Sequence, residues 1–258
     1  MISKEQNKTM AKQRADHKID FGYELVDEDK KVEQVREVFD SVAPKYDLLN
    51  DILSLGLHRW WKRICIGEAQ VKPGTKVLDI ASGTGDLAMA FAKRAGEGNV
   101  VATDINHEML ALGKKRLENL GYHCHAVEAD AENLPFPEST FDIVTVSFGI
   151  RNMTHKDRAL QEMFRVLKPG GRLLVLEFSK CDRWFKPIYD FYSFKFMPWV
   201  GGTVAGDAHS YQYLAESIRM HPDQKTFAQM MKEVGFSEVH WKNLTFGICA
   251  LHIGYKKV

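Results

Sequence analysis

The chain has 258 residues, of which 45% are hydrophobic and 27% are charged, as expected for a globular protein with a substantial hydrophobic core. Its formal net charge of +1 excludes a strong overall attraction to nucleic acid or to an anionic membrane, so no nucleic-acid partner is expected. The four cysteines contain no C-x-x-C pair, which favours reduced thiols in a cytoplasmic protein over a disulfide framework.

The N-terminal part of the chain is expected to consist of a tail and a helical lid. Residues 1–31 are polar and mixed in charge, and we predict a flexible tail without a secretory signal, docked at most through Phe21, Tyr23 and Leu25. Apolar residues then recur at helical spacing and are followed by polar and large aromatic side chains. We interpret residues 32–70 as a helical lid over a ligand site.

The segment Val77–Leu87 carries the strongest functional signal in the sequence. It begins as an apolar strand with Asp79 near its end and continues through a turn containing Gly83 and Gly85 into a helix. Ligands of open α/β sheets bind beyond the carboxyl ends of the strands, at a turn of this kind. Glycines let the backbone of such a turn approach the ligand. We therefore predict a nucleotide-binding corner formed by Asp79 and these glycines.

Two ligands fit this corner. The two glycines and Ala88 match the G-x-G-x-x-G/A fingerprint of dinucleotide sites, with Asp104 roughly 20 residues downstream as a ribose-binding acid. An NAD-dependent oxidoreductase is therefore one alternative. A pyrophosphate, however, is bound by free N–H groups at a helix N-terminus and would be repelled by Asp79 and Asp86. These two acids favour a ligand with a positive end and no phosphate, and we predict S-adenosylmethionine.

Strands and helices alternate through the central part of the chain, which predicts a doubly wound, mostly parallel α/β sheet. Asp104 ends the second strand, where it can accept hydrogen bonds from ribose hydroxyls, and Asp130 and Ala131 follow the third, where they can contact an adenine. Arg151 and Asn152 follow the fourth strand, on the substrate side. The expected strands are Lys76–Ile80, Val100–Thr103, Val127–Ala129, Phe141–Ser147 and Arg172–Glu177.

Two features close the chain. Residues 181–204 form an aromatic segment with heptad-like spacing, and a helix that is apolar on most sides needs burial, a lipophilic ligand or a membrane. Core packing and a lipophilic pocket both remain open for it. Two final strands, Phe236–Trp241 and Ile248–Tyr255, are expected to form an antiparallel hairpin at the sheet edge. No metal site is expected at His123-Cys124-His125, because strand geometry would place the cysteine on the opposite face from the histidines.

Several segments resemble the ubiquinone/menaquinone biosynthesis C-methyltransferase family. The first signature is a pattern over residues 46–62 that begins Tyr46-Asp47, and the second is Arg165–Ser179. Phe148–Asn152 and Tyr213–Pro222 also match the family. The resemblance covers about residues 33–258, with Ser82 in place of a glycine that is usual in the family.

This resemblance implies a Rossmann-like class I methyltransferase fold that uses S-adenosylmethionine and releases S-adenosyl-L-homocysteine. It further implies carbon methylation of a polyprenylated benzoquinol, of demethylmenaquinol, or of both. A lipid-soluble substrate predicts transient membrane-surface contact by a peripheral cytoplasmic protein, and a quinone-biosynthesis complex is a candidate partner. The family's donor contacts fall on Thr84, Asp104, Asp130, Ala131 and Ser147.

Methylation of a ring carbon requires an electron-rich ring, which ionisation of a quinol hydroxyl provides. A cation beside the hydroxyl typically lowers such a pKa by ~1–3 units, and Arg151 is the candidate. A guanidinium stays protonated, so Arg151 is not itself the base. Asn152 would orient the hydroxyl or a water. Tyr46, His58 or a water would accept the proton.

Two other functions remain alternatives to this reading: methylation of a different small phenol, and a donor-binding subunit for assembly of a quinone-synthesis complex. After the tail, residues 32–258 are expected to form one domain. Its parts are the lid, a donor-binding core at 71–180, a substrate-cap insertion at 181–225, and a last helix with the edge hairpin at 226–258.

Overall fold

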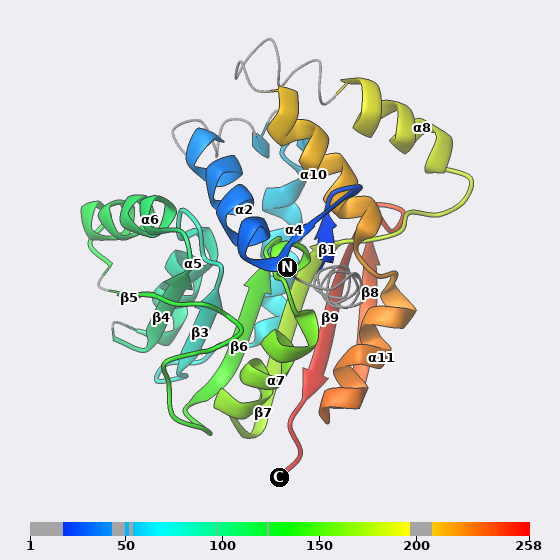
Figure 1. The fold of residues 1–258 in the computed structure, drawn as a ribbon. Coiled ribbons are helices and arrows are strands. Elements are labelled where there is room, and N and C mark those ends of the chain that lie inside the picture. Colours follow the sequence, from blue (N-terminus) through cyan, green and yellow to red (C-terminus); the bar gives the residue numbers. More distant parts are fainter. Residues whose placement is uncertain (1–17, 43–49, 52–53, 97, 123, 197–207) are drawn as a thin grey trace, which may run out of the picture.

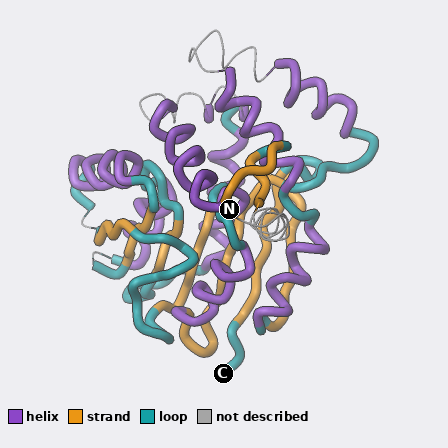
Figure 2. Tube along the Cα trace, viewed as in Figure 1, coloured by secondary structure: helices purple, strands orange, loops and turns teal. Residues whose placement is uncertain are grey.

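The computed structural model describes residues 18–42, 50–51, 54–96, 98–122, 124–196 and 208–258. Its centre is a seven-stranded sheet in the order β5-β4-β3-β6-β7-β9-β8, with helices on both faces (Figures 1 and 2). This architecture confirms the predicted doubly wound, mostly parallel sheet. The strands are β3 Val77–Ile80, β4 Val100–Asp104, β5 His125–Glu128, β6 Phe141–Ser147, β7 Leu167–Phe178, β8 Ser237–Leu244 and β9 Cys249–Tyr255.

Strands β5, β4, β3, β6 and β7 pair in parallel, with helical crossovers from β3 to β4, from β4 to β5 and from β6 to β7. The central strand β3 is buried along its whole length, as expected for a strand covered on both faces. The carboxyl ends of β3 and β6 therefore lie side by side at the same end of the sheet. The connecting helices are α5 Asp86–Ala95, α6 His107–Asn119 and α7 Lys156–Val166, with the short 3-10 turn η2 Ile150–Asn152 after β6.

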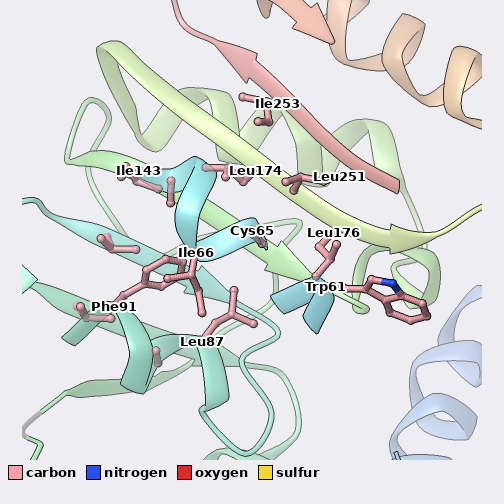
Figure 3. Close-up of a cluster of buried hydrophobic side chains, with 14 of the residues drawn as sticks. Trp61, Cys65, Ile66, Leu87, Phe91, Ile143, Leu174, Leu176, Leu251 and Ile253 are labelled. Carbon is pink, nitrogen blue, oxygen red and sulfur yellow. The ribbon is translucent and has the colours of Figure 1, made fainter. Parts of the chain in front are cut away.

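Two clusters of buried apolar side chains hold the helices against the sheet. Successive residues of β7 fall in different clusters, Leu174 in one and Leu173 in the other, so the clusters lie on opposite faces. The first joins α4 (Leu57–Ala69) and α5 to the sheet and contains Trp61 and Phe91 (Figure 3). The second packs α7 and α11 (Gln224–Val234) against the other face. Trp61 is a core residue, with its indole N–H donating to the Thr245 hydroxyl over 2.8 Å.

The chain ends in the predicted antiparallel hairpin. Strand β9 pairs antiparallel with both β7 and β8, so the last strand inserts between its hairpin partner and the parallel part of the sheet. All but the last residue of β9 are buried, which explains the apolar run at the end of the sequence. The hairpin thus extends the core beyond β7.

The N-terminal part differs from the expected tail. Strands β1 Lys18–Phe21 and β2 Glu24–Asp27 form a small hairpin, and helix α2 begins at Glu28 and ends at Val42. Phe21 docks as expected, but Tyr23 and Leu25 remain 58% and 66% exposed. The turn is possible because Gly22 has a φ of +60°, and the contacts that hold the hairpin come from a helix almost 200 residues further along. No local pattern could indicate that partner.

Three helices and the N-terminal hairpin lie over the carboxyl ends of the parallel strands (Figure 1). These helices are α2, α8 (Lys186–Phe191) and α10 (Ala208–Met220). A π-helical turn, Tyr192–Phe196, follows α8, and residues 197–204 of the expected aromatic segment lie outside the described residues. Among those residues, no helix is both long enough and apolar enough to span a membrane.

Candidate active site

A cavity of about 320 Å³ opens above the carboxyl ends of β3 and β6. Its walls come from α2, α4, the β3–α5 turn, the end of β6, α8 and α10. One part of the lining is polar and belongs to the glycine-rich turn, and another is aromatic. The predicted site residues that line it are His58, Asp79, Gly83, Thr84, Ser147 and Arg151.

The glycine-rich turn has the geometry that its sequence predicts. Gly83 and Gly85 have φ values of 55° and 80°, and Gly85 stands at the N-terminus of α5. The serine that replaces a glycine usual in the family causes no strain of this kind, because the positive φ falls on Ala81 (51°) and not on Ser82. The Ser82 hydroxyl is buried and has no hydrogen-bond partner among the described residues. It is therefore available to a ligand.

Asp104 supports the turn from behind. Its two carboxylate oxygens accept hydrogen bonds from the backbone N–H groups of Gly83 (2.8 Å) and Asn106 (2.9 Å). Burial raises the pKa of Asp104, while these backbone hydrogen bonds act in the opposite direction. Asp104 and Gly85 are not part of the cavity lining. In this structure the acid at the end of β4 therefore fixes the loop that faces the cavity.

The two acids of the turn have different surroundings. Asp86 is compensated by two cations, with the Lys62 amino group and the Arg116 guanidinium each 2.8 Å from its carboxylate. The choice of S-adenosylmethionine over a dinucleotide treated Asp86 as an uncompensated negative charge, and the structure shows that it is compensated. Asp79 is 1% exposed, and its carboxylate accepts a hydrogen bond from the Thr145 hydroxyl at 2.7 Å. Burial raises the pKa of Asp79 to about 7, so this buried acid would be stabilised by a positive ligand.

Asp130 and Ala131, the expected adenine contacts, are not in the cavity lining. Asp130 is exposed, and its side chain accepts the backbone N–H of Glu132 at 2.9 Å. Ala131 is buried in the apolar cluster under α7. Ser147 does line the cavity, and its buried hydroxyl has no hydrogen-bond partner within the described ranges. The unpaired hydroxyls of Ser82 and Ser147, together with Asp79, fit the polar and cationic groups of S-adenosylmethionine.

Arg151 is the middle residue of η2 and is buried at the cavity wall. Its Nη1 donates to Glu177 Oε1 over 2.9 Å and also to the Phe148 carbonyl oxygen. The Nε group is buried and has no hydrogen-bond partner in the part of the chain that the structure describes, and the guanidinium lies 5.5 Å from the Phe178 ring centroid. Glu177 was not predicted as a site residue. Its position at the end of a parallel strand was the available signal, because acids in that position face the ligand side.

Asn152 does not line the cavity itself but is hydrogen-bonded to a residue that does, Tyr213. It is half-buried and outside the lining, and its Oδ1 accepts a hydrogen bond from the Tyr213 hydroxyl at 3.1 Å. Tyr213 lines the cavity, is 5% exposed and stacks on Phe21. The sequence contained Tyr213 in a family-like segment, but nothing in its spacing indicated that it meets Asn152.

His58 faces the cavity from α4 and is 7% exposed. Its Nδ1 is 2.7 Å from the Ser54 hydroxyl, and its Nε2 is 3.6 Å from Asp51 Oδ1. Burial, and then the charge of Lys62, lowers the pKa of His58, so the ring is neutral at neutral pH and able to accept a proton. Tyr46, the other predicted acceptor, lies outside the described residues. Within them, no group of three or more metal-ligating side chains is present.

A family model described as the ubiE/COQ5 methyltransferase family matches residues 26–256. The ubiquinone/menaquinone biosynthesis C-methyltransferase UbiE of Laribacter hongkongensis is 60% identical over 237 residues, which cover 92% of this chain and 97% of that protein. The protein of the same name from Cupriavidus metallidurans is 58% identical over 237 residues, covering 92% and 98%. These matches confirm the expected family and, with it, an S-adenosylmethionine-dependent methyltransferase.

Solved structures share the fold at low identity. The [4+2]-cyclase SpnF is 17% identical with a TM-score of 0.65, over 87% of this chain and 96% of that chain. An S-adenosylmethionine-dependent methyltransferase from Thermotoga maritima is 18% identical with a TM-score of 0.60, over 86% and 99%. Because a cyclase shares the fold, the fold alone does not determine the reaction. It agrees with the expected class I architecture.

Proposed function

The chain belongs to the ubiE/COQ5 methyltransferase family, and from this premise we propose that it methylates a ring carbon of a polyprenylated benzoquinol, of demethylmenaquinol, or of both. The observation that carries this proposal is the composition of the cavity. Its turn end offers a buried acid and unpaired hydroxyls, and much of the remaining wall is aromatic or aliphatic. An aromatic ring with an apolar tail fits the second part. The aromatic lining includes Phe148, Phe178, Phe185, Tyr189, Tyr192 and Tyr213.

The methyl donor would lie at the turn end, where it supplies an electrophilic methyl group on a positive sulfur. Asp79 would face the positive part of the donor, while Gly83, Thr84 and Ser147 would bind its polar groups. Asp104 and Asp130 remain the proposed ribose and adenine contacts. Each would contact the donor after a change in the side-chain positions seen here, because neither lines the cavity.

The ring would be activated beside Arg151. A free phenol has a pKa near ~10 and is ionised to roughly one part in a thousand at pH 7. The Arg151 guanidinium, buried at the cavity wall with its Nε unpaired, would stabilise the phenolate and so raise that fraction. The phenolate delocalises charge onto the ring carbon that takes the methyl group. His58, neutral and in the lining, would accept the phenolic proton, with Tyr46 or a water as the other acceptors.

The test is to incubate the purified protein with labelled S-adenosylmethionine and with matched reduced and oxidised short-tail demethyl quinones. Mass spectrometry then locates the label. We expect a new carbon-bound methyl group from the reduced ring only. Transfer to an unprenylated phenol at the same rate would replace the proposed substrate class, and no transfer to any ring would favour a role in complex assembly.

We also propose that the protein contacts a membrane surface through α8. Three large apolar side chains of this region are exposed: Trp184 (63%), Ile188 (58%) and Phe191 (70%). Ile188 also lines the cavity, so the exposed apolar face continues into the substrate pocket. Lys186 lies among them with its amino group near Asp190. An apolar face of this kind suits shallow insertion at a lipid interface, from which a prenyl tail could enter the cavity.

The Trp184→Ser/Phe191→Ser variant tests this contact, because neither residue lines the cavity. We expect weaker flotation with phosphatidylcholine/phosphatidylglycerol vesicles and slower methylation of a long-tail quinol in those vesicles. Methylation of a short-tail quinol in detergent should not change. A Leu112→Ser/Leu120→Ser variant, at apolar side chains 42% and 53% exposed around α6, is the matched control. Equal vesicle binding by both variants would refute the assignment of this surface.

A further inference from the structure

The Tyr213 hydroxyl is held in one hydrogen-bonding role. Tyr213 lies on α10 and lines the cavity, and its O–H donates to Asn152 Oδ1 at 3.1 Å. A phenol group has one proton to donate and lone pairs that accept. Because the proton is used by Asn152, the Tyr213 oxygen is left as an acceptor.

The ring that carries this hydroxyl is fixed by the N-terminal hairpin. Phe21 stacks on it with 4.2 Å between the ring centroids and 17° between the planes. The hairpin is anchored in turn to α10, where the backbone N–H of Tyr23 donates to Glu216 Oε2 at 3.0 Å. Phe21 and Tyr213 are each 5% exposed. Stacking at this depth keeps the ring from swinging away from Asn152.

The hydroxyl also keeps its proton at physiological pH. Burial raises the pKa of Tyr213 well above its usual value, although the nearby charge of Arg151 acts in the opposite direction. The Arg151 charge acts on the Tyr213 hydroxyl, and both side chains line the cavity, so the two groups belong to the same part of it. Arg151 can attract the oxygen of a reduced or an oxidised ring alike. It cannot distinguish the two forms by hydrogen-bond polarity.

We infer that the Tyr213–Asn152 pair is a specificity determinant that selects the reduced, hydroxyl-bearing ring over the oxidised quinone. A quinol O–H can donate to the Tyr213 oxygen. A quinone carbonyl oxygen can only accept a hydrogen bond. It would therefore face the lone pairs of the Tyr213 oxygen, unless the Tyr213 O–H gave up its hydrogen bond to Asn152 and donated to the carbonyl. A site built to pair with a hydroxyl discriminates against the analogue that lacks it. This inference rests on the proposed function, because it requires the substrate ring to lie in this cavity.

The experiment measures KM for a short-tail demethyl quinol and the competitive inhibition constant Ki of the matched oxidised quinone. The quantity of interest is the ratio Ki/KM. Tyr213→Phe keeps the stacked ring and removes the acceptor, so we expect the ratio to fall about three- to tenfold, the range that one neutral hydrogen bond spans. Asn152→Ala frees the Tyr213 proton for a quinone carbonyl, so Ki itself should fall. Asn152→Asp retains an acceptor oxygen and should preserve the ratio.

Folding and donor binding are checked for every variant by thermal melting and S-adenosylhomocysteine titration. Tyr122→Phe, which removes a tyrosine hydroxyl outside the cavity lining, is the matched control and should leave the ratio unchanged. An unchanged ratio in folded Tyr213→Phe and Asn152→Ala would overturn the inference. A wild-type protein that neither methylates the quinol nor is inhibited by the quinone would overturn the proposed function instead, before any variant is compared.

Discussion

Replacing Glu177 with glutamine tests the buried ion pair that holds Arg151 at the cavity. The two side chains are 6% and 2% exposed, and Arg151 Nη1 lies 2.9 Å from Glu177 Oε1. The change removes the only negative charge paired with this guanidinium among the described residues. Leaving one partner of a buried ion pair uncompensated typically costs about 3–5 kcal/mol. Glutamine retains an amide oxygen that can accept from Arg151, so we expect the low end of this range.

A loss of about 3 kcal/mol corresponds to a Tm decrease of roughly 6–12 °C for a domain of this size. Thermal melting monitored by circular dichroism measures it. The control is Glu68→Gln, which breaks an ion pair whose Lys242 and Glu68 side chains are 49% and 31% exposed. Exposed pairs contribute at most about 1 kcal/mol. If Glu177→Gln and Glu68→Gln lower Tm equally, the buried pair does not stabilise the fold as argued.

The same variant makes a second, catalytic prediction. Without Glu177 the positive charge of Arg151 is less compensated, so it should lower the pKa of a bound quinol hydroxyl further. The rising limb of the kcat–pH profile is then expected to move to lower pH. The variant is also less stable to heat, which would reduce the amount of folded protein in a warm assay. Activity must be measured well below the Tm of the variant. A shift to higher pH would refute the role proposed for Arg151 in ionising the ring.

Three further predictions concern the core, the buried histidines and the charges of the donor site. Phe91→Ala, at a side chain with no solvent exposure, should lower the free energy of unfolding by about 3–5 kcal/mol in urea titrations. Burial lowers the pKa of His252 to about 4 and places that of His221 well below its usual value, so the unfolded chain binds more protons below pH ~6.5. Their stabilising effect should be complete above that pH and lost as the pH falls towards 4, and a pH series of urea unfolding curves that shows no such loss would contradict it. Asp79→Asn should weaken the binding of S-adenosylmethionine more than the binding of S-adenosylhomocysteine in calorimetric titrations, because only S-adenosylmethionine has a positive sulfur. Lys62→Met should change that affinity ratio in the opposite direction, since the Lys62 charge acts on Asp79.

The parts of the fold that the sequence predicts are those whose causes are local. The strand, glycine turn and helix around Gly83 lie within a dozen residues, and Gly83 and Gly85 both adopt the positive φ angles that glycine adopts most easily. The final hairpin is equally local. Strand positions agree with the expected ones to within a few residues because each strand combines an apolar run with turn residues at its ends. The exception is β7, which begins at Leu167 and not at the expected Arg172. Parallel order follows once helices connect such strands.

What the sequence could not supply are the pairings between distant segments. Phe21 and Tyr213 stack although they are far apart in the sequence. The polar composition of the N-terminal segment, considered alone, therefore predicted a tail. Glu177 and Arg151 come from the ends of neighbouring strands, where many polar side chains compete for the same place. Asn152 was expected at the substrate but lies behind Tyr213. Each of these depends on helix placement over the sheet, which periodicity does not determine.

S-adenosylmethionine was inferred from two acids of the donor turn, but the structure supports only one of them as the reason. Asp79 and Asp86 both appeared to disfavour a pyrophosphate, but Asp86 has two cations at 2.8 Å and adds little net negative charge to the cavity. Of these two acids, Asp79 has no ion pair within the described residues, and its raised pKa shows that its charge is poorly solvated there. A donor with a positive amino group and sulfur would supply what burial removes, whereas a pyrophosphate would increase the penalty. The preference for a cationic donor is therefore carried by Asp79, and its strength depends on how far Lys62 already compensates that carboxylate.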